Sequence, residues 1–200
     1  QRSLNDYLRE QGYNPLSLRE PGSTPWGERL RINLLDPAVG HLSPKTEAAA
    51  FVGAGIEMFE GIIKVALQHG RTILQDRWRQ STMAYQGHGG GVDLKMIKLL
   101  TEWSTDGARP DLTLLIDIPP QLALKNKRLL RTNPDRMERH GEDYRERVRQ
   151  GYLQMAVEDP LGTKLVPYLD GQFHTMQDEI RKIVDEYIAT FALEERLKRV

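Results

Sequence analysis

The segment Asp-Leu-Thr-Leu-Leu-Ile-Asp-Ile, at residues 111–118, decides the fold class of this chain. It is an almost unbroken apolar run, which is the pattern of a strand covered on both faces in a parallel sheet. Segments 71–75 and 163–169 have the same character, and a short extended piece covers 15–18. The sequence therefore predicts a buried parallel sheet.

Segments of helical character separate these strands. A short first helix around 4–8 ends near Gly12, and later helices are expected over 25–35, 46–68, 94–103, 120–130, 143–158 and 177–198. Alternation of strands and helices is typical of a doubly wound α/β protein with helices on both faces of its sheet. We expect one domain that spans residues 1–200.

Composition and charge exclude several classes of protein. Lys plus Arg and Asp plus Glu both count 28, so the net charge is zero, which argues against a protein that coats nucleic acid or an anionic membrane. The chain has no cysteine, which excludes disulfides and thiolate metal sites and fits a reducing compartment. No apolar run approaches the roughly 18–20 residues that span a bilayer, and no signal peptide is evident. We therefore expect a cytoplasmic protein without nucleic-acid or membrane partners.

Basic residues are concentrated between Lys125 and Arg145, in about one-tenth of the chain. One interpretation is a solvated helix-loop-helix surface, which the residues alone favour. The other is a mobile, arginine-rich lid over about residues 126–142 that closes over phosphate groups.

Four blocks of sequence, in the same order and at sensible spacing, resemble bacterial and phage thymidylate kinases. They are Arg19-Glu20-Pro21-Gly22-Ser23-Thr24-Pro25; Asp76-Arg77-Trp78 with the Ser-Thr-Met-Ala-Tyr-Gln-Gly of 81–87; Pro110 to Leu114 with Asp117 and Pro119-Pro120; and Asp135-Arg136-Met137-Glu138 with 145–153. Together they cover essentially the whole chain. The resemblance implies a P-loop-kinase-like fold and the ATP-dependent, Mg²⁺-dependent phosphorylation of dTMP to dTDP.

The second block carries the residues closest to the expected chemistry. Asp76 and Arg77 follow a buried strand, so they emerge at its carboxyl end, where open α/β sheets bind ligands. By the resemblance, Arg77 is a catalytic residue that holds the monophosphate. Asp76 is a catalytic residue that lies near the magnesium ion and the reacting phosphates. Without the resemblance, the two would be interpreted as a strand-end ion pair.

The resemblance also implies a pocket for the thymine base. Thr82, Tyr85 and Gln86 lie where the family contacts the base, and a hydroxyl or an amide can satisfy its polar edge. Phe51 matches the aromatic residue that stacks on thymine. The alternative is that Phe51 and Tyr85 are ordinary core residues. Residues of the first block are expected to line the same pocket, namely Arg19, Glu20 and Pro21.

In the lid, the resemblance implies Arg128, Arg131 and Arg136 as catalytic candidates that contact phosphates on closure. An arginine supplied there would stabilise charge on the transferred group. The spacing does not show which of the three would do so.

Two features depart from the family pattern. The family begins with a strand and a Gly-x-x-x-x-Gly-Lys-Ser/Thr loop that holds the ATP phosphates. That string is absent here, so the ATP-binding residues are unassigned, and we expect a longer natural chain in which a central strand and this loop precede Gln1. Gly55 stands where the family has an arginine that helps to grip the monophosphate, which leaves strict dTMP specificity open.

Two alternative functions therefore remain. One is a kinase for another pyrimidine monophosphate, and the other is a non-catalytic nucleotide-binding pseudo-enzyme. The family commonly forms homodimers, and the apolar helix around 58–67 is the expected contact surface. The alternative for that helix is a place in the core of the same chain.

Overall fold

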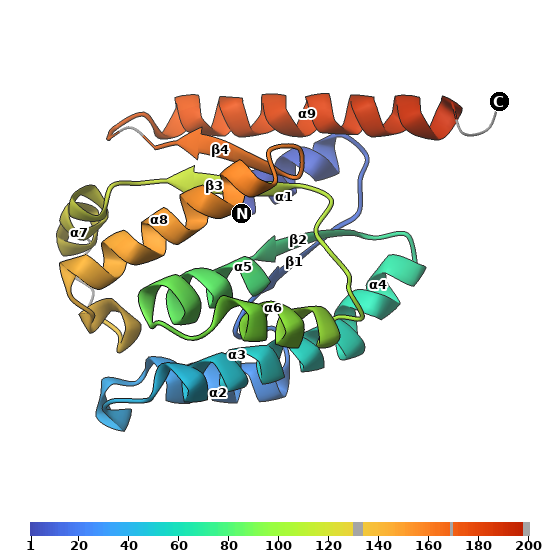
Figure 1. Ribbon diagram of the computed structural model, residues 1–200. Coiled ribbons are helices and arrows are strands. Elements are labelled where there is room, and N and C mark those ends of the chain that lie inside the picture. The colour runs from blue at the N-terminus through green and yellow to red at the C-terminus, as the bar shows by residue number, and fades with distance from the viewer. Residues whose placement is uncertain (130–133, 169, 198–200) are drawn as a thin grey trace.

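The computed structural model describes residues 1–129, 134–168 and 170–197 (Figure 1). Its strands are β1 (Pro15–Arg19), β2 (Thr72–Asp76), β3 (Thr113–Asp117) and β4 (Thr163–Pro167). Its α-helices are α1 (Arg2–Glu10), α2 (Pro25–Leu35), α3 (Pro44–Met58), α4 (Lys64–Gln68), α5 (Arg79–Thr82), α6 (Leu94–Trp103), α7 (Pro120–Leu129), α8 (Glu142–Glu158) and α9 (Phe173–Leu197). Short segments of 3₁₀-helix are η1 (Pro37–Val39) and η4 (Met137–Arg139), and short segments of π-helix are η2 (Phe59–Ile63) and η3 (Met83–Gly89).

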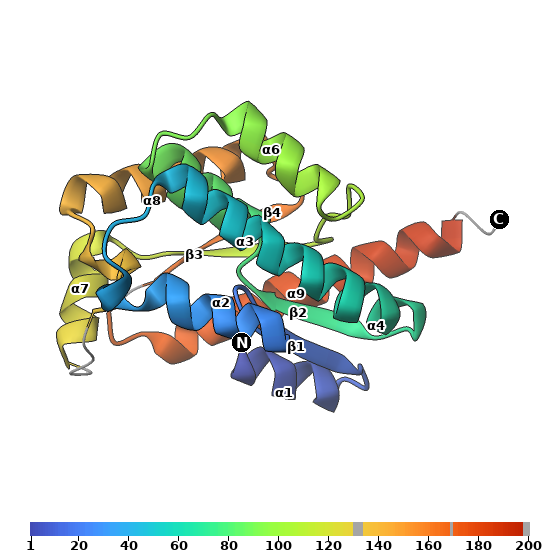
Figure 2. The same cartoon turned by 90° about the horizontal axis from the view of Figure 1, so that it is seen from below.

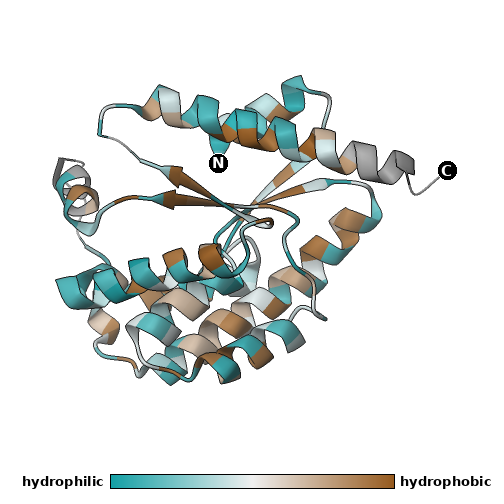
Figure 3. Ribbon diagram, turned by 45° about the horizontal axis from the view of Figure 1, so that its top comes forward, coloured by the Kyte–Doolittle hydropathy of each residue, from teal (hydrophilic) through white to brown (hydrophobic). Residues whose placement is uncertain are grey.

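The strands confirm the α/β class but pair differently from the expectation of one continuous sheet. β1 pairs with β2 in parallel, and β3 pairs with β4 in parallel. Among the described residues, these are two separate two-stranded sheets, because β2 and β3 exchange no ladder hydrogen bonds. The four strands nevertheless lie in one mostly hydrophobic layer, with α1 and α9 on one side and the remaining long helices on the other (Figure 3).

Two apolar clusters fix the helices to the strands. Val166 of β4 is fully buried against Met176 and Ile180 of α9. On the other side, Leu18 of β1 is buried with the side chains of the α3–η2 junction. No helix in the described part of the chain is both long enough and apolar enough to cross a membrane.

The helix expected over 46–68 is interrupted by the π-helical turn η2 between α3 and α4. Met58, Phe59 and Ile63 are each at most 4% exposed and pack against Leu18. These three side chains therefore belong to the core of the chain, whereas Val65 and Leu67 of the same segment are 49% and 52% exposed, and a dimer surface over 58–67 stays a prediction. The outer surface on this side is formed by α2, α3 and α6, with α3 between the other two (Figure 2).

The segment from α5 to η3 was not predicted as helical. It contains Gly87 and Gly89, and glycine is a poor helix former. Here packing decides the conformation, because a Cβ atom at Gly89 would lie 2.7 Å from Cγ2 of Val148 in α8. The glycine therefore allows α8 to approach η3 closely.

Candidate active site

Two of the sequence blocks meet at the carboxyl ends of β1 and β2. Arg19 and Asp76 are register partners, and the amide of Glu20 donates to the carbonyl of Asp76 at 2.9 Å. The side chains of Asp76 and Arg77 are exposed. Arg77 has a positive φ of 66°, an uncommon conformation for a non-glycine residue that is typical of tight turns and functional sites. The expected strand-end placement of Asp76 and Arg77 is confirmed.

The guanidinium group of Arg77 lies over one aromatic ring. Its Cζ lies 5.1 Å from the ring centroid of Tyr85, within the range of a cation–π interaction. The Tyr85 ring in turn meets the ring of Tyr152 edge-on, with centroids 6.4 Å apart. Tyr152 donates to Oγ of Ser81 at 2.7 Å, and its burial raises the pKa of the phenol to about 12, so it stays protonated. One tyrosine ring thus lies against the Arg77 cation beside the strand end, and a second tyrosine packs against that ring.

The first sequence block forms the turn after β1. Arg19 makes an ion pair with Glu28 at 2.8 Å, and Glu28 also accepts from the amide of Ser23 at 2.8 Å. The hydroxyl of Thr24 caps α2 by accepting from the amide of Gly27 at 2.9 Å. Pro21 is buried in this turn. The turn is thus held by its own side chains, with the Arg19 guanidinium on its outside.

Glu20 is a buried carboxyl group at the same strand end. Its side chain is 7% exposed, and its buried Oε2 has no hydrogen-bond partner among the residues that the structure describes. Burial raises the pKa of this carboxyl to about 8. A Cβ atom on Gly55 of α3 would lie only 2.8 Å from Oε1 of Glu20. The Glu20 carboxyl therefore occupies the space where a side chain at position 55 would begin.

The residues expected to contact a base lie on three neighbouring elements, but not all are accessible. Tyr85 of η3 and Phe51 of α3 are half-buried, and α3 packs against both α5 and η3. Thr82 and Gln86 are buried, at 4% and 1% exposed. The structure therefore brings the four residues into one region, with the side chains of Thr82 and Gln86 covered by protein.

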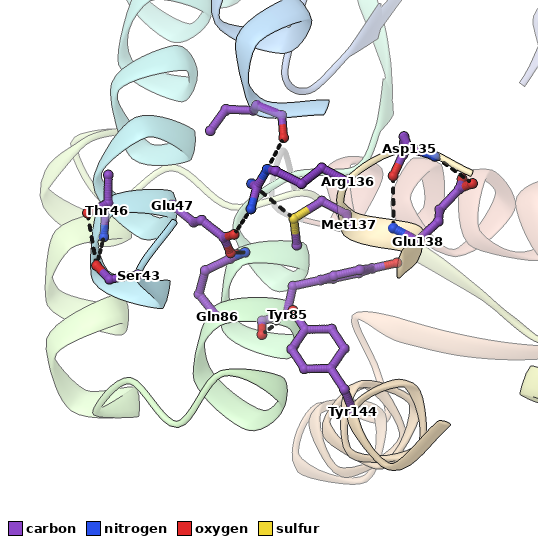
Figure 4. Close-up of polar contacts among 11 residues, drawn as sticks. Ser43, Thr46, Glu47, Tyr85, Gln86, Asp135, Arg136, Met137, Glu138 and Tyr144 are labelled. Carbon is purple, nitrogen blue, oxygen red and sulfur yellow. Dashed lines mark hydrogen bonds and ion pairs between the residues drawn. The ribbon is translucent and has the colours of Figure 1, made fainter. Parts of the chain in front are cut away.

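Behind Gln86 lies an ion pair that the sequence analysis did not predict. Nε2 of Gln86 donates to Oε2 of Glu47 at 3.0 Å, and Oε1 of Glu47 pairs with Arg136 at 2.5 Å (Figure 4). Nε of Arg136 also donates to the carbonyl of Leu34 at 2.8 Å. The guanidinium of Arg136 is thus engaged inside the protein. Of the other lid candidates, Arg131 and the side chain of Arg128 lie outside what the structure describes.

Tyr144 and Arg149 of α8 are further site residues that sequence reasoning missed. The hydroxyl of Tyr144 donates to the carbonyl of Tyr85 at 2.9 Å, and burial raises the pKa of that phenol. Arg149 holds Asp117, at the end of β3, through two hydrogen bonds of 2.7 and 2.8 Å. The only available signal was that Arg149 lies within the fourth block and Tyr144 immediately before its second part, and that position does not say what each side chain contacts.

The donor set for a metal ion is small. No cluster of three or more His, Cys, Asp or Glu side chains suited to a metal ion occurs within the described residues. Asp76 offers one exposed carboxylate. This fits Mg²⁺, which proteins commonly hold through one or two carboxylates, with water and substrate phosphates as the other ligands.

Comparisons with known proteins agree with this geometry. The family model for thymidylate kinase matches residues 1–167. A thymidylate kinase from Thermoanaerobacter sp. (strain X514) is 36% identical over 187 residues, which cover 92% of this chain and 89% of the relative. One from Syntrophotalea carbinolica is 38% identical over 168 residues, covering 82% and 78% of the two chains.

A solved structure gives the same result for the fold. The crystal structure of thymidylate kinase from Ehrlichia chaffeensis superposes with a TM-score of 0.73 at 28% sequence identity. The match covers 91% of this chain and 88% of that one. These matches, which agree with the strand-end aspartate and arginine, show that the chain belongs to the thymidylate kinase family.

Proposed function

We propose that this chain phosphorylates dTMP to dTDP, with ATP as the phosphoryl donor and Mg²⁺ as the metal ion. Membership of the family supports this activity. The observation that carries the proposal is the exposed Asp76–Arg77 pair at the end of β2, with Arg77 beside the Tyr85 ring. No observation on this chain favours a different pyrimidine monophosphate or a non-catalytic role.

In this proposal Arg77 binds the phosphate of dTMP, and the Tyr85 ring keeps its guanidinium in place. Mg²⁺ bound at Asp76 would neutralise charge on the reacting phosphates. Phe51 and Tyr85 provide apolar surface for the base. Arg19, Glu20 and Pro21 line the pocket from the turn after β1, and Thr82 and Gln86 shape it from behind.

The ATP side of the reaction has no assigned residue in this sequence. It contains no Gly-x-x-x-x-Gly-Lys-Ser/Thr string. Arg128 and Arg131 remain predicted phosphate contacts of the lid. A cytoplasmic location also remains a prediction.

A coupled assay of ADP production tests the function. The purified protein is supplied with ATP, Mg²⁺ and, in parallel, dTMP, dUMP, dCMP or dGMP. We expect turnover with dTMP. Turnover only with another monophosphate would keep the enzyme class and change the substrate. Binding of dTMP without turnover of any monophosphate would support the pseudo-enzyme.

We also propose a homodimer that uses the surface of α2, α3 and α6 in Figure 2. Met96, Leu99 and Trp103 on α6 are 51%, 62% and 67% exposed, at the spacing of one helical face. Light scattering after size-exclusion chromatography should give twice the chain mass, and Leu99→Asp should give a monomer. A wild-type monomer at micromolar concentration would contradict this proposal.

A further inference from the structure

Three buried polar side chains from distant parts of the sequence form a closed network beside the proposed pocket. Glu47 lies in the first turn of α3, Gln86 in η3 and Arg136 immediately before η4. They are 3%, 1% and 7% exposed. As Figure 4 shows, the carboxylate of Glu47 lies between the other two, with one oxygen on each partner.

The network satisfies its charged groups almost completely. Arg136 donates from Nη1 to Glu47, from Nε to the carbonyl of Leu34, and from its backbone amide to the carbonyl of Leu35. An ion pair this deeply buried is a poor means of gaining stability, because removing both charges from water costs about as much as their attraction returns. Buried polar networks do, however, hold side chains in one arrangement. The network therefore requires an explanation other than stability.

Its position relative to Arg77 supplies that explanation. Gln86 directly follows Tyr85, whose ring lies under the Arg77 guanidinium, 5.1 Å from Cζ to centroid. The carbonyl of Tyr85 is held from α8 by the Tyr144 hydroxyl at 2.9 Å. η3 is thus fixed from one side by Tyr144 and from the other by Glu47 acting on Gln86. A shift of this turn would move the Tyr85 ring, and with it the cation that the ring supports.

We propose that Glu47 is a positioning residue for dTMP binding, which acts through Gln86 on the Tyr85–Arg77 wall of the pocket. Arg136 is the counter-charge that holds the Glu47 carboxylate in place, so it anchors the end of the lid segment to α2 and α3. This inference rests on the proposed function. It assigns Arg136 a role in positioning and leaves contact with phosphate to other arginines.

The test removes the charges but keeps the packing. Glu47→Leu with Arg136→Met replaces the ion pair by apolar side chains of similar size, which is often tolerated in buried sites. We expect the double variant to melt within a few degrees of wild type. We expect its Kd for dTMP, measured by calorimetry, to rise about tenfold, equivalent to about 1.4 kcal/mol. The KM for ATP should stay unchanged, because the affected wall faces the monophosphate.

Gln86→Leu is the second variant, and it leaves the ion pair intact. If Glu47 acts through Gln86, this variant raises the Kd for dTMP to a similar extent. The triple variant, which combines Glu47→Leu, Arg136→Met and Gln86→Leu, then has the same Kd as the double variant. Fully additive losses would overturn the proposed route. A Kd within twofold of wild type in the folded double variant, or in Gln86→Leu, would overturn the proposal itself.

Matched neutralisation of an exposed ion pair, Glu102→Gln with Arg109→Gln, is the control and should leave the Kd unchanged. Absence of dTMP binding by the wild-type chain would instead refute the proposed function. The two failures are therefore distinguishable.

Discussion

The two most informative buried carboxyl groups of this chain are stabilised in opposite ways. Glu47, 3% exposed, is shared between the guanidinium of Arg136 and the amide of Gln86. Glu20, 7% exposed, has a carboxylate oxygen, Oε2, without a hydrogen-bond partner among the described residues, and burial raises the pKa of this carboxyl to about 8. A buried acid needs either a partner or a proton. The region around Glu47 is therefore held by an ion pair and a hydrogen bond, whereas we expect the strand end around Glu20 to respond to pH.

The largest effect that would test this difference is the pH dependence of stability. Between pH 4.5 and 8, folded Glu20 keeps its proton while the unfolded chain, with an ordinary carboxyl, loses it. The free energy of unfolding should therefore fall as pH rises, by up to about 5 kcal/mol from this group. Urea unfolding at several pH values from 5 to 8 measures how the free energy of unfolding changes with pH. The Glu20→Gln variant should lack the part of this change that comes from Glu20. An unchanged slope in that variant would show that Glu20 is ionised in the folded chain.

The next effect concerns the exposed charge at the strand end. Arg77→Met should lower kcat/KM for dTMP by about 10³-fold, because a positioned cation on a reacting phosphate group contributes that order of rate enhancement. The melting temperature should change little, since the side chain is exposed. Arg9→Met, a loss of charge at an exposed position of α1, is the matched control. A comparable loss of activity in both variants would contradict the proposal that Arg77 binds the phosphate of dTMP.

A smaller effect should come from the hydrogen bond that fixes η3 to α8. Tyr144→Phe leaves the carbonyl of Tyr85 without its 2.9 Å donor and should cost about 1 kcal/mol of unfolding free energy. Tyr13→Phe, at an exposed position, controls for the loss of a hydroxyl. Equal urea midpoints for the two variants would mean that solvent replaces the Tyr144 bond.

The smallest effect is expected at a solvated ion pair. Glu102 and Arg109 pair at 3.2 Å, and Arg109 is largely exposed. Glu102→Gln should change the unfolding free energy by no more than about 0.5 kcal/mol, and less in high salt. If Glu102→Gln lowered the unfolding free energy by several kcal/mol, the exposure of an ion pair would not predict how little it contributes to the stability of this chain.

The sequence predicted the elements better than the connections between them. Apolar runs and helix periodicity gave the parallel strands and α6 at its observed bounds of 94–103, because burial in a sheet or on a helix face leaves a local pattern. The helical turns over 79–89 were missed, since their glycines are explained only by the close approach of α8. The pairing of Glu47 with Arg136 was missed for a similar reason. An acid in the first turn of a helix is sufficiently explained by the helix dipole, and nothing local indicates a partner 89 residues away.

The close contact between α8 and η3 also has a consequence for mutational tolerance. A Cβ atom at Gly151 would lie 2.5 Å from the ring of His88, and one at Gly89 would lie 2.7 Å from Val148. Neither glycine has a positive φ, so both positions could accept alanine if only backbone conformation mattered. Gly89 and Gly151 lie far apart in the sequence, and neither has a side chain that could react or bind. Saturation mutagenesis scored on survival should nevertheless show that both positions do not tolerate even alanine, which adds a single methyl group.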